Sequence, residues 1–216
     1  MLHLIMLLGL LQSAPSSKEV VERCGSLSHS ELEGQLKRSN EGERGIIHLF
    51  LAAGDSTGGP SLDSAWTVLD SLQRAKPSAL HAALLGTADA LQARRTRGDV
   101  IVATRWVGKA IEHLDAAVAA DSMDLAVRIF RINSLVEVPE IFHVDKRLRR
   151  DEAFLRARFP KLAQADAGTL LALAALNYRF GNLGEATALW KLVAGRKIAS
   201  VTQRAQARRR LESIRG

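Results

Sequence analysis

Aromatic residues and cysteine are scarce in this chain of 216 residues. Phe, Trp and Tyr make up 5% of it, while Ala, Leu and Arg are abundant. Because strands favour β-branched and aromatic side chains and helices favour Ala, Leu and Arg, the composition predicts an all-α fold. The single cysteine, Cys24, excludes an intrachain disulfide and a site built from several thiolates. With 47% hydrophobic and 25% charged residues, the chain is expected to be globular, with one substantial core.

The sequence also lacks the short motifs that bind nucleotides and metals. It contains neither Gly-x-Gly-x-x-Gly nor a P-loop, so nothing in it supports nucleotide binding. It has no His-Glu-x-x-His and no Cys-x-x-Cys, and His48, His81, His113 and His143 are far apart along the chain. We expect these histidines to have structural roles on helix faces. We therefore expect no metal, no cofactor and no catalytic residue, and a protein that is not an enzyme.

An apolar run occupies residues 1–14, MLHLIMLLGLLQSA, and is too short to span a bilayer as a helix. Pro-Ser-Ser and then charged residues follow, which is the outline of a signal peptide with Ala14 as the natural cleavage point. No Lys or Arg precedes the run, however, and Pro15 follows Ala14 directly. The favoured interpretation is a signal peptide over 1–17 and export to the periplasm or outside. The alternative is a cytoplasmic protein whose apolar N-terminal helix packs onto its body.

Helical periodicity runs from about Ser30 to the end of the chain. Ser30 and Glu33 have the spacing of a capping box, in which each side chain satisfies a backbone donor at a helix start. Short polar, Gly- or Pro-containing segments interrupt the periodicity at 55–60, 76–77, 97–98, 121–122, 138–139, 159–160, 181–182 and 195. This spacing predicts an array of helices joined by short connections.

One pattern recurs between these breaks: a small residue, a large apolar residue four positions later, an apolar or small residue three further on, and a helix stop after five more. Its three occurrences are Ala65, Leu69, Leu72, Pro77; Ala110, Leu114, Ala117, Ser122; and Ala186, Trp190, Val193, Ile198. The small residue marks a close contact between helices, and the next two fill the same face. A helix with its own apolar–small pair precedes each occurrence: Ala52-Ala53, Leu85-Gly86 and Leu173-Ala174.

This pattern resembles the tetratricopeptide repeat (TPR) family, whose units are two antiparallel helices over about 34 residues. The resemblance covers 46–200, preceded by a helical segment at 18–45 and followed by a basic capping helix at 201–216. The unit at 167–200 matches best, and the second unit carries an insertion at 94–101. The third is degenerate, because its register places Glu152 where a large apolar residue belongs. An unrelated array of α-hairpins would share much of the pattern.

The resemblance implies a concave groove lined by the first helix of each unit. It places Phe50, Thr87, Asn133 and Tyr178 in that groove, beside the apolar residues Ile47, Leu80, Ile129 and Leu171. Such a groove would hold a peptide or be covered by the chain's own N-terminal helices. We expect a non-enzymatic scaffold or adaptor that binds a protein or peptide partner there.

A second resemblance concerns Ser56. Residues 54–60 read Gly-Asp-Ser-Thr-Gly-Gly-Pro, similar to the Gly-Asp-Ser-Gly-Gly-Pro around the active serine of chymotrypsin-like proteases. That site also needs an antiparallel barrel, an upstream His and Asp, and a loop without the extra Thr57. The sequence shows no barrel pattern, its upstream histidines His29 and His48 lack the family's surrounding residues, and the segment falls between two predicted helices. We therefore predict a turn.

Basic residues suggest the alternative function. The net charge of +7 and pI near 10.1 favour anionic partners, meaning nucleic acid or an anionic membrane surface. The C-terminal helix is the preferred contact, through Arg204, Arg208, Arg209 and Arg210. No aromatic residues alternate with these arginines, which disfavours nucleic acid. Arg94–Arg97 and Lys146–Arg150 are further clusters, and we expect the acidic residues Asp145, Asp151 and Glu152 to neutralise the latter.

The three tryptophans, Trp66, Trp106 and Trp190, fall in the second helices of the predicted units at core spacing. We expect all three to pack in the core.

Overall fold

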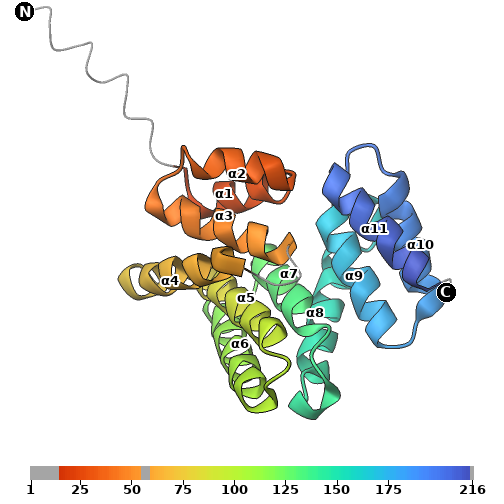
Figure 1. Ribbon diagram of the computed structural model, residues 1–216. Coiled ribbons are helices and arrows are strands. Elements are labelled where there is room, and N and C mark those ends of the chain that lie inside the picture. Colours follow the sequence, from red (N-terminus) through yellow and green to blue (C-terminus); the bar gives the residue numbers. More distant parts are fainter. Residues whose placement is uncertain (1–14, 55–58, 215–216) are drawn as a thin grey trace, which may run out of the picture.

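The computed structural model describes residues 15–54 and 59–214 (Figure 1). Over these residues the regular secondary structure is helical, with no strand, which confirms the all-α part of the predicted fold class. The α-helices are α1 (Ser17–Cys24), α2 (His29–Leu36), α3 (Glu41–Gly54), α4 (Gly59–Ala75), α5 (Ala79–Arg95), α6 (Val100–Ala120), α7 (Leu125–Leu135), α8 (Asp145–Arg158), α9 (Ala167–Arg179), α10 (Leu183–Gly195) and α11 (Val201–Ser213). Two 3-10 helices, η1 (Glu140–Phe142) and η2 (Leu162–Gln164), lie on either side of α8.

The predicted breaks coincide with the helix ends. From α4 to α10 each helix ends at, or a few residues before, an interruption read from the sequence. Gly181 has a φ of 81°, a conformation that glycine adopts without strain, in the tight connection between α9 and α10. The predicted turn that contains Ser56 lies outside the described residues.

The predicted cap of α2 is wrong by two residues. The N-cap is Ser28, not Ser30. The Ser28 backbone N–H donates to Glu31 Oε2 over 2.7 Å, and the Glu31 backbone N–H donates to the Ser28 hydroxyl oxygen. The sequence Ser28-His29-Ser30-Glu31-Leu32-Glu33 contains two overlapping capping boxes. The structure uses the earlier box, and Leu32 is the buried residue of the helix.

Neighbouring helices pack as pairs, most extensively α5 with α6, α3 with α4, and α9 with α10. The first helices of successive pairs also touch, α5 against α7 and α7 against α9. At the N-terminal end α1 and α2 pack on α3, and at the other end α11 packs on α10 (Figure 1). No helix within residues 15–54 and 59–214 is both long and apolar enough to cross a membrane.

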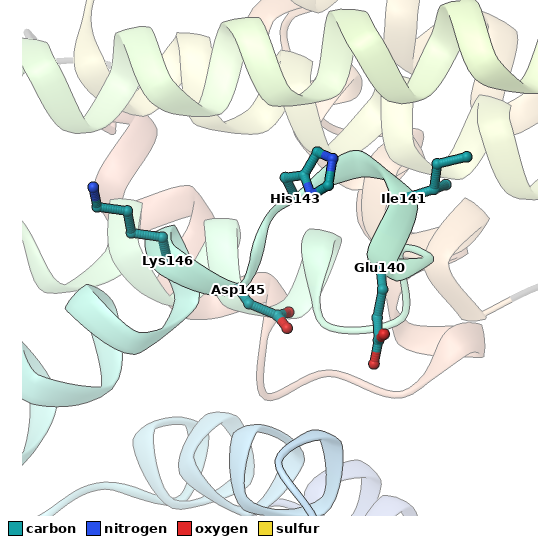
Figure 2. Close-up of a pocket in the computed structure, with 5 residues that line it drawn as sticks. All are labelled: Glu140, Ile141, His143, Asp145 and Lys146. Carbon is teal, nitrogen blue, oxygen red and sulfur yellow. The ribbon is translucent and has the colours of Figure 1, made fainter.

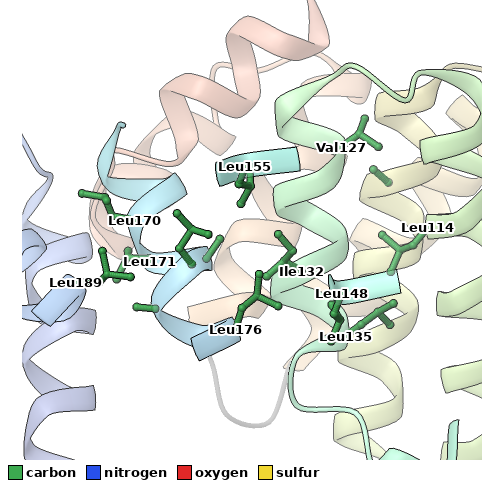
Figure 3. Packing of buried hydrophobic residues seen from close by; sticks show 14 of the residues in the cluster. Leu114, Val127, Ile132, Leu135, Leu148, Leu155, Leu170, Leu171, Leu176 and Leu189 are labelled. Atoms are coloured by element: carbon green, nitrogen blue, oxygen red, sulfur yellow. The ribbon is translucent and has the colours of Figure 1, made fainter. Parts of the chain in front are cut away.

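The core consists of two clusters that meet at α5. One joins α1 to α5, and the other continues from α5 to α11; Phe130 of α7 packs against both. In the second cluster, leucines of α9 lie beside Ile132 and Leu135 of α7, with Leu189 of α10 behind them (Figure 3). Ala65, Ala110 and Ala186, the small residues of the repeated pattern, are each at most 1% exposed, as predicted.

Two glycines bring paired helices into close contact. A Cβ on Gly86 of α5 would lie 2.7 Å from Leu114 Cγ and 3.2 Å from the Ala110 carbonyl oxygen, so the predicted Leu85-Gly86 contact is confirmed. In α3 the equivalent residue is Gly45, where a Cβ would lie 2.6 Å from Val68 Cγ1. The close contact therefore lies about two turns before the predicted pair Ala52-Ala53, of which Ala52 is fully buried and Ala53 is exposed.

The third pair, α7 and α8, is joined partly by charge. Asp151 of α8 is fully buried and accepts hydrogen bonds from Arg131 Nε (2.8 Å), Arg131 Nη2 (2.7 Å) and Arg128 Nη1 (2.6 Å) of α7. Arg131 also donates to Asp115 of α6 over 3.0 Å. The sequence pattern placed Glu152 at the core position, but the buried residue is Asp151, one position earlier.

Helix α1 is also tied to the start of α5. The Ser17 hydroxyl lies 2.9 Å from His81 Nε2, while His81 Nδ1 lies 2.9 Å from the carbonyl oxygen of Lys76. The carbonyl can only accept, so Nδ1 carries the proton and Nε2 accepts from Ser17. His81 is buried and structural, as expected.

Candidate functional site

The four predicted groove residues lie on α3, α5, α7 and α9, the first helices of the four pairs. Asn133 and Tyr178 are exposed, whereas Phe50 and Thr87 are partly buried. The Thr87 hydroxyl donates to the Ala83 carbonyl oxygen (2.9 Å) and accepts from the hydroxyl of Ser134 (3.1 Å). The second hydrogen bond links Thr87 of α5 to Ser134, the residue after Asn133 in α7. The two helices therefore carry polar groups next to each other.

Phe50 lies in a different environment. It packs against the N-terminal core cluster, and its Cε1 would be 4.0 Å from a Cβ placed on Gly25, just after α1. The N-terminal helices thus cover this end of the predicted groove. The sequence had left this arrangement open as an alternative to an empty groove.

Tyr178 stands on an aromatic platform between α9 and α10. Its ring centroid is 5.7 Å from that of Trp190, with the planes inclined at 51°. Trp190 is 2% exposed, as predicted for a core residue, while Tyr178 is 46% exposed. Leu183 and Leu192, also of this helix pair, are 53% and 40% exposed. The pair therefore offers a fixed aromatic ring and aliphatic surface to solvent.

The other two tryptophans form a half-open seam at the edge of the core. Trp66 of α4 and Trp106 of α6 meet edge to face, with centroids 5.9 Å apart and planes at 80°. Both are partly buried, and the Lys109 ammonium lies 4.6 Å from the Trp106 ring centroid. As predicted, Trp66 and Trp106 pack against the core clusters, but both are only partly buried and their indoles bridge neighbouring pairs at the surface.

Beneath this seam lies a cluster that sequence patterns did not indicate. Asp89 of α5 is fully buried and accepts from Trp66 Nε1 over 2.8 Å, and His113 Nδ1 of α6 lies 2.6 Å from its other oxygen. The hydrogen bond to Asp89 raises the pKa of His113; burial opposes this shift, and Glu112 and Asp70 add to it. The only sequence signal was the polar residue within the otherwise apolar face of α5.

This cluster predicts pH-dependent stability. Because the folded-state pKa of His113 lies above the ordinary histidine pKa of about 6.5, the charged pair stabilises the fold fully below pH 6.5 and loses that contribution as pH rises through the folded-state pKa. Urea unfolding of the protein and of His113→Asn should therefore differ more below pH 6.5 than about two units above it. Asn retains a donor for Asp89 but does not titrate. A pH-independent difference would contradict the prediction.

Two shallow depressions mark the surface. One, of 510 Å³, is lined by Glu140, Ile141, His143, Asp145 and Lys146 where η1 leads into α8 (Figure 2). The other, of 470 Å³, lies between α3 and α4 and includes His48. Burial lowers the pKa of His48, and its buried Nδ1 lacks a hydrogen-bond partner, so the neutral imidazole is favoured there.

The C-terminal arginines are only partly available to a polyanion. Arg204 donates to the carbonyl oxygens of Arg196, Lys197 and Ala199, and so closes the connection before α11. Arg210 pairs with Glu137. Arg208 and Arg209 are exposed. Half of the predicted contact set therefore has a structural role.

The acidic residues beside the Lys146–Arg150 cluster do not neutralise it as expected. Asp145 accepts from Arg179 of α9 over 2.8 Å, Glu152 pairs with Arg156, and Asp151 is buried against α7. Of the cluster, Arg147 donates to Asp115 of α6 over 2.6 Å. The charge of the remaining basic residues is therefore compensated less than the sequence suggested.

Within residues 15–54 and 59–214 there is no group of three or more His, Cys, Asp or Glu side chains that could hold a metal ion. Burial raises the pKa of the Cys24 thiol to about 11, so it is protonated at neutral pH.

No protein-family model, curated protein or solved structure matches the chain.

Proposed function

We propose that the protein is a non-enzymatic, TPR-like scaffold that binds a protein or peptide partner through exposed side chains of its first helices. The observation that carries this proposal is the series of contacts from α5 to α7 to α9, with Asn133 and Tyr178 exposed on two of these helices. Helix pairs stacked in this way, with small residues at Gly86 and Ala110 in the pair contact, are typical of TPR arrays.

In this proposal Tyr178 is the main contact residue. Its ring already rests on Trp190, so a partner that buries it pays little additional conformational entropy. Aromatic residues fixed in this way dominate the energetics of many interfaces. Asn133 and the Thr87–Ser134 hydroxyl pair would supply polar contacts that orient the partner. Phe50 has no part in it, because the N-terminal helices cover that residue.

The proposal predicts that Tyr178→Ala weakens capture of a partner by about tenfold or more, the usual effect of removing a central aromatic contact. Partners are identified by mass spectrometry after pull-down from the native host, and the affinity of the recurrent one is then measured. Helical circular dichroism should not change, because Tyr178 is half-exposed.

Ile198→Ala is the matched control. Ile198 is 87% exposed but lies in the connection between α10 and α11, outside the proposed surface. Equal affinity for the Tyr178→Ala variant and the unchanged protein would eliminate the proposed site.

A further inference from the structure

The outward face of α8 carries only basic and small residues. The exposed positions of this helix are Lys146, Arg149, Arg150, Ala153, Ala157 and Arg158. The acidic residues of α8 all lie at buried or partly buried positions, where they pair with arginines outside this face. The arrangement leaves a flat, positively charged strip without an acidic side chain.

An exposed aliphatic side chain lies next to this strip. Ile141 of η1 is 77% exposed and lines the same depression as Lys146. Figure 2 shows Ile141, His143 and Lys146 pointing to one side of the chain, while Glu140 and Asp145 point to the other. Ile141 and Lys146 therefore share one side of this segment, while the carboxylates of Glu140 and Asp145, which line the same depression, point the other way.

The segment that presents Ile141 is held firmly. Arg179 of α9 donates to the carbonyl oxygens of Val136 (2.7 Å) and Val138 (2.8 Å), and Arg147 donates to that of His143 (3.3 Å). Ile141 is thus kept in solvent by a fixed backbone, and burying it in a binding partner requires little further ordering.

We propose that Ile141, Lys146, Arg149 and Arg150 form a docking surface for a bilayer containing anionic phospholipid. The basic side chains would lie among the anionic headgroups, and Ile141 would enter the boundary between headgroups and acyl chains. This surface is distinct from that of Tyr178 and does not depend on the proposed function.

A bilayer fits these residues better than a nucleic acid does. Single-stranded nucleic acid is usually held by exposed aromatic rings, whereas Phe180 beside Arg149 is partly buried and covered by its guanidinium, 3.9 Å from the ring centroid. Phosphate backbones make no use of an exposed aliphatic side chain such as Ile141, whereas the interfacial region of a bilayer does.

The test is co-sedimentation of the full chain with phosphatidylcholine vesicles with and without phosphatidylglycerol. Each basic residue near an anionic surface changes the partition coefficient by about fivefold, so Lys146→Ala/Arg150→Ala should weaken binding to anionic vesicles about 30-fold. Ile141→Ser should weaken it about tenfold. Pure phosphatidylcholine vesicles measure any binding by the apolar run at 1–14, which all variants share.

Lys37→Ala/Arg38→Ala is the matched control, because it removes the same two charges from exposed positions after α2. It should retain more than about half of the binding. Three results would overturn the proposal: no preference for phosphatidylglycerol, an equal loss in the control, or loss of duplex DNA binding in the α8 variant with vesicle binding unchanged. The last would identify the strip as a nucleic-acid surface.

Discussion

Replacing Asp151 with alanine is expected to lower the free energy of unfolding by about 3–5 kcal/mol, the largest effect of any single substitution considered. Asp151 is fully buried and accepts three hydrogen bonds from Arg128 and Arg131, whose side chains are 12% and 7% exposed. Removing the carboxylate leaves the charge of both arginines with little compensation in a poorly solvated site. Asp115 is the remaining partner of Arg131.

Urea unfolding followed by circular dichroism measures this effect, and the thermal midpoint should fall by roughly 10 °C. Glu137→Ala is the control, because Glu137 pairs with Arg210 at the surface, where the two side chains are 63% and 43% exposed. Exposed pairs of this kind contribute about 0.5 kcal/mol. If Asp151→Ala lowers the free energy of unfolding by less than about 1 kcal/mol, Asp151 is not the buried partner of Arg128 and Arg131.

The helices and most of their core positions could be predicted from the sequence, because breaks and small residues are local signals. Ala65, Ala110 and Ala186 are buried where the repeated spacing placed them. Trp190 fills the core for the same reason, since its helix has apolar residues at regular intervals.

Other features depend on which helix faces which, and a local pattern cannot supply that information. Asp151 falls between Leu148 and Leu155 on one stripe, but the arginines that make its burial favourable come from α7. Asp89 likewise needs Trp66 and His113 from two other helices.

The candidate site was predicted only in part for the same reason. Tyr178 is exposed on its helix, but Phe50 is covered by a segment about 25 residues earlier in the chain. The basic residues of α8 seemed neutralised because their acidic neighbours in sequence were taken as neighbours in space. Those acids instead pair with arginines on α7 and α9 and within α8 itself.

The second large effect is expected at Gly86, where substitution by alanine should destabilise the protein by about 1–3 kcal/mol. The new Cβ would approach Leu114 Cγ to 2.7 Å, while Ala110 and His113 restrict the space on either side. Leu114 is fully buried, so α5 and α6 must separate or the leucine must leave its preferred rotamer. This cost exceeds the roughly 1 kcal/mol that alanine gains over glycine in a helix.

Gly108→Ala is the control that separates packing from helix propensity. It makes the same change as Gly86→Ala, and Gly108 also lies within a helix. Gly108 lies on the exposed side of α6, and no atom outside its own helix backbone lies within 4 Å of a Cβ placed there. This variant should gain about 0.5–1 kcal/mol by reducing the freedom of the unfolded chain. Opposite signs at the two glycines, measured by urea unfolding, are the expected result. If Gly86→Ala also stabilises the protein, α5 and α6 cannot be in the close contact on which the packing of this pair depends.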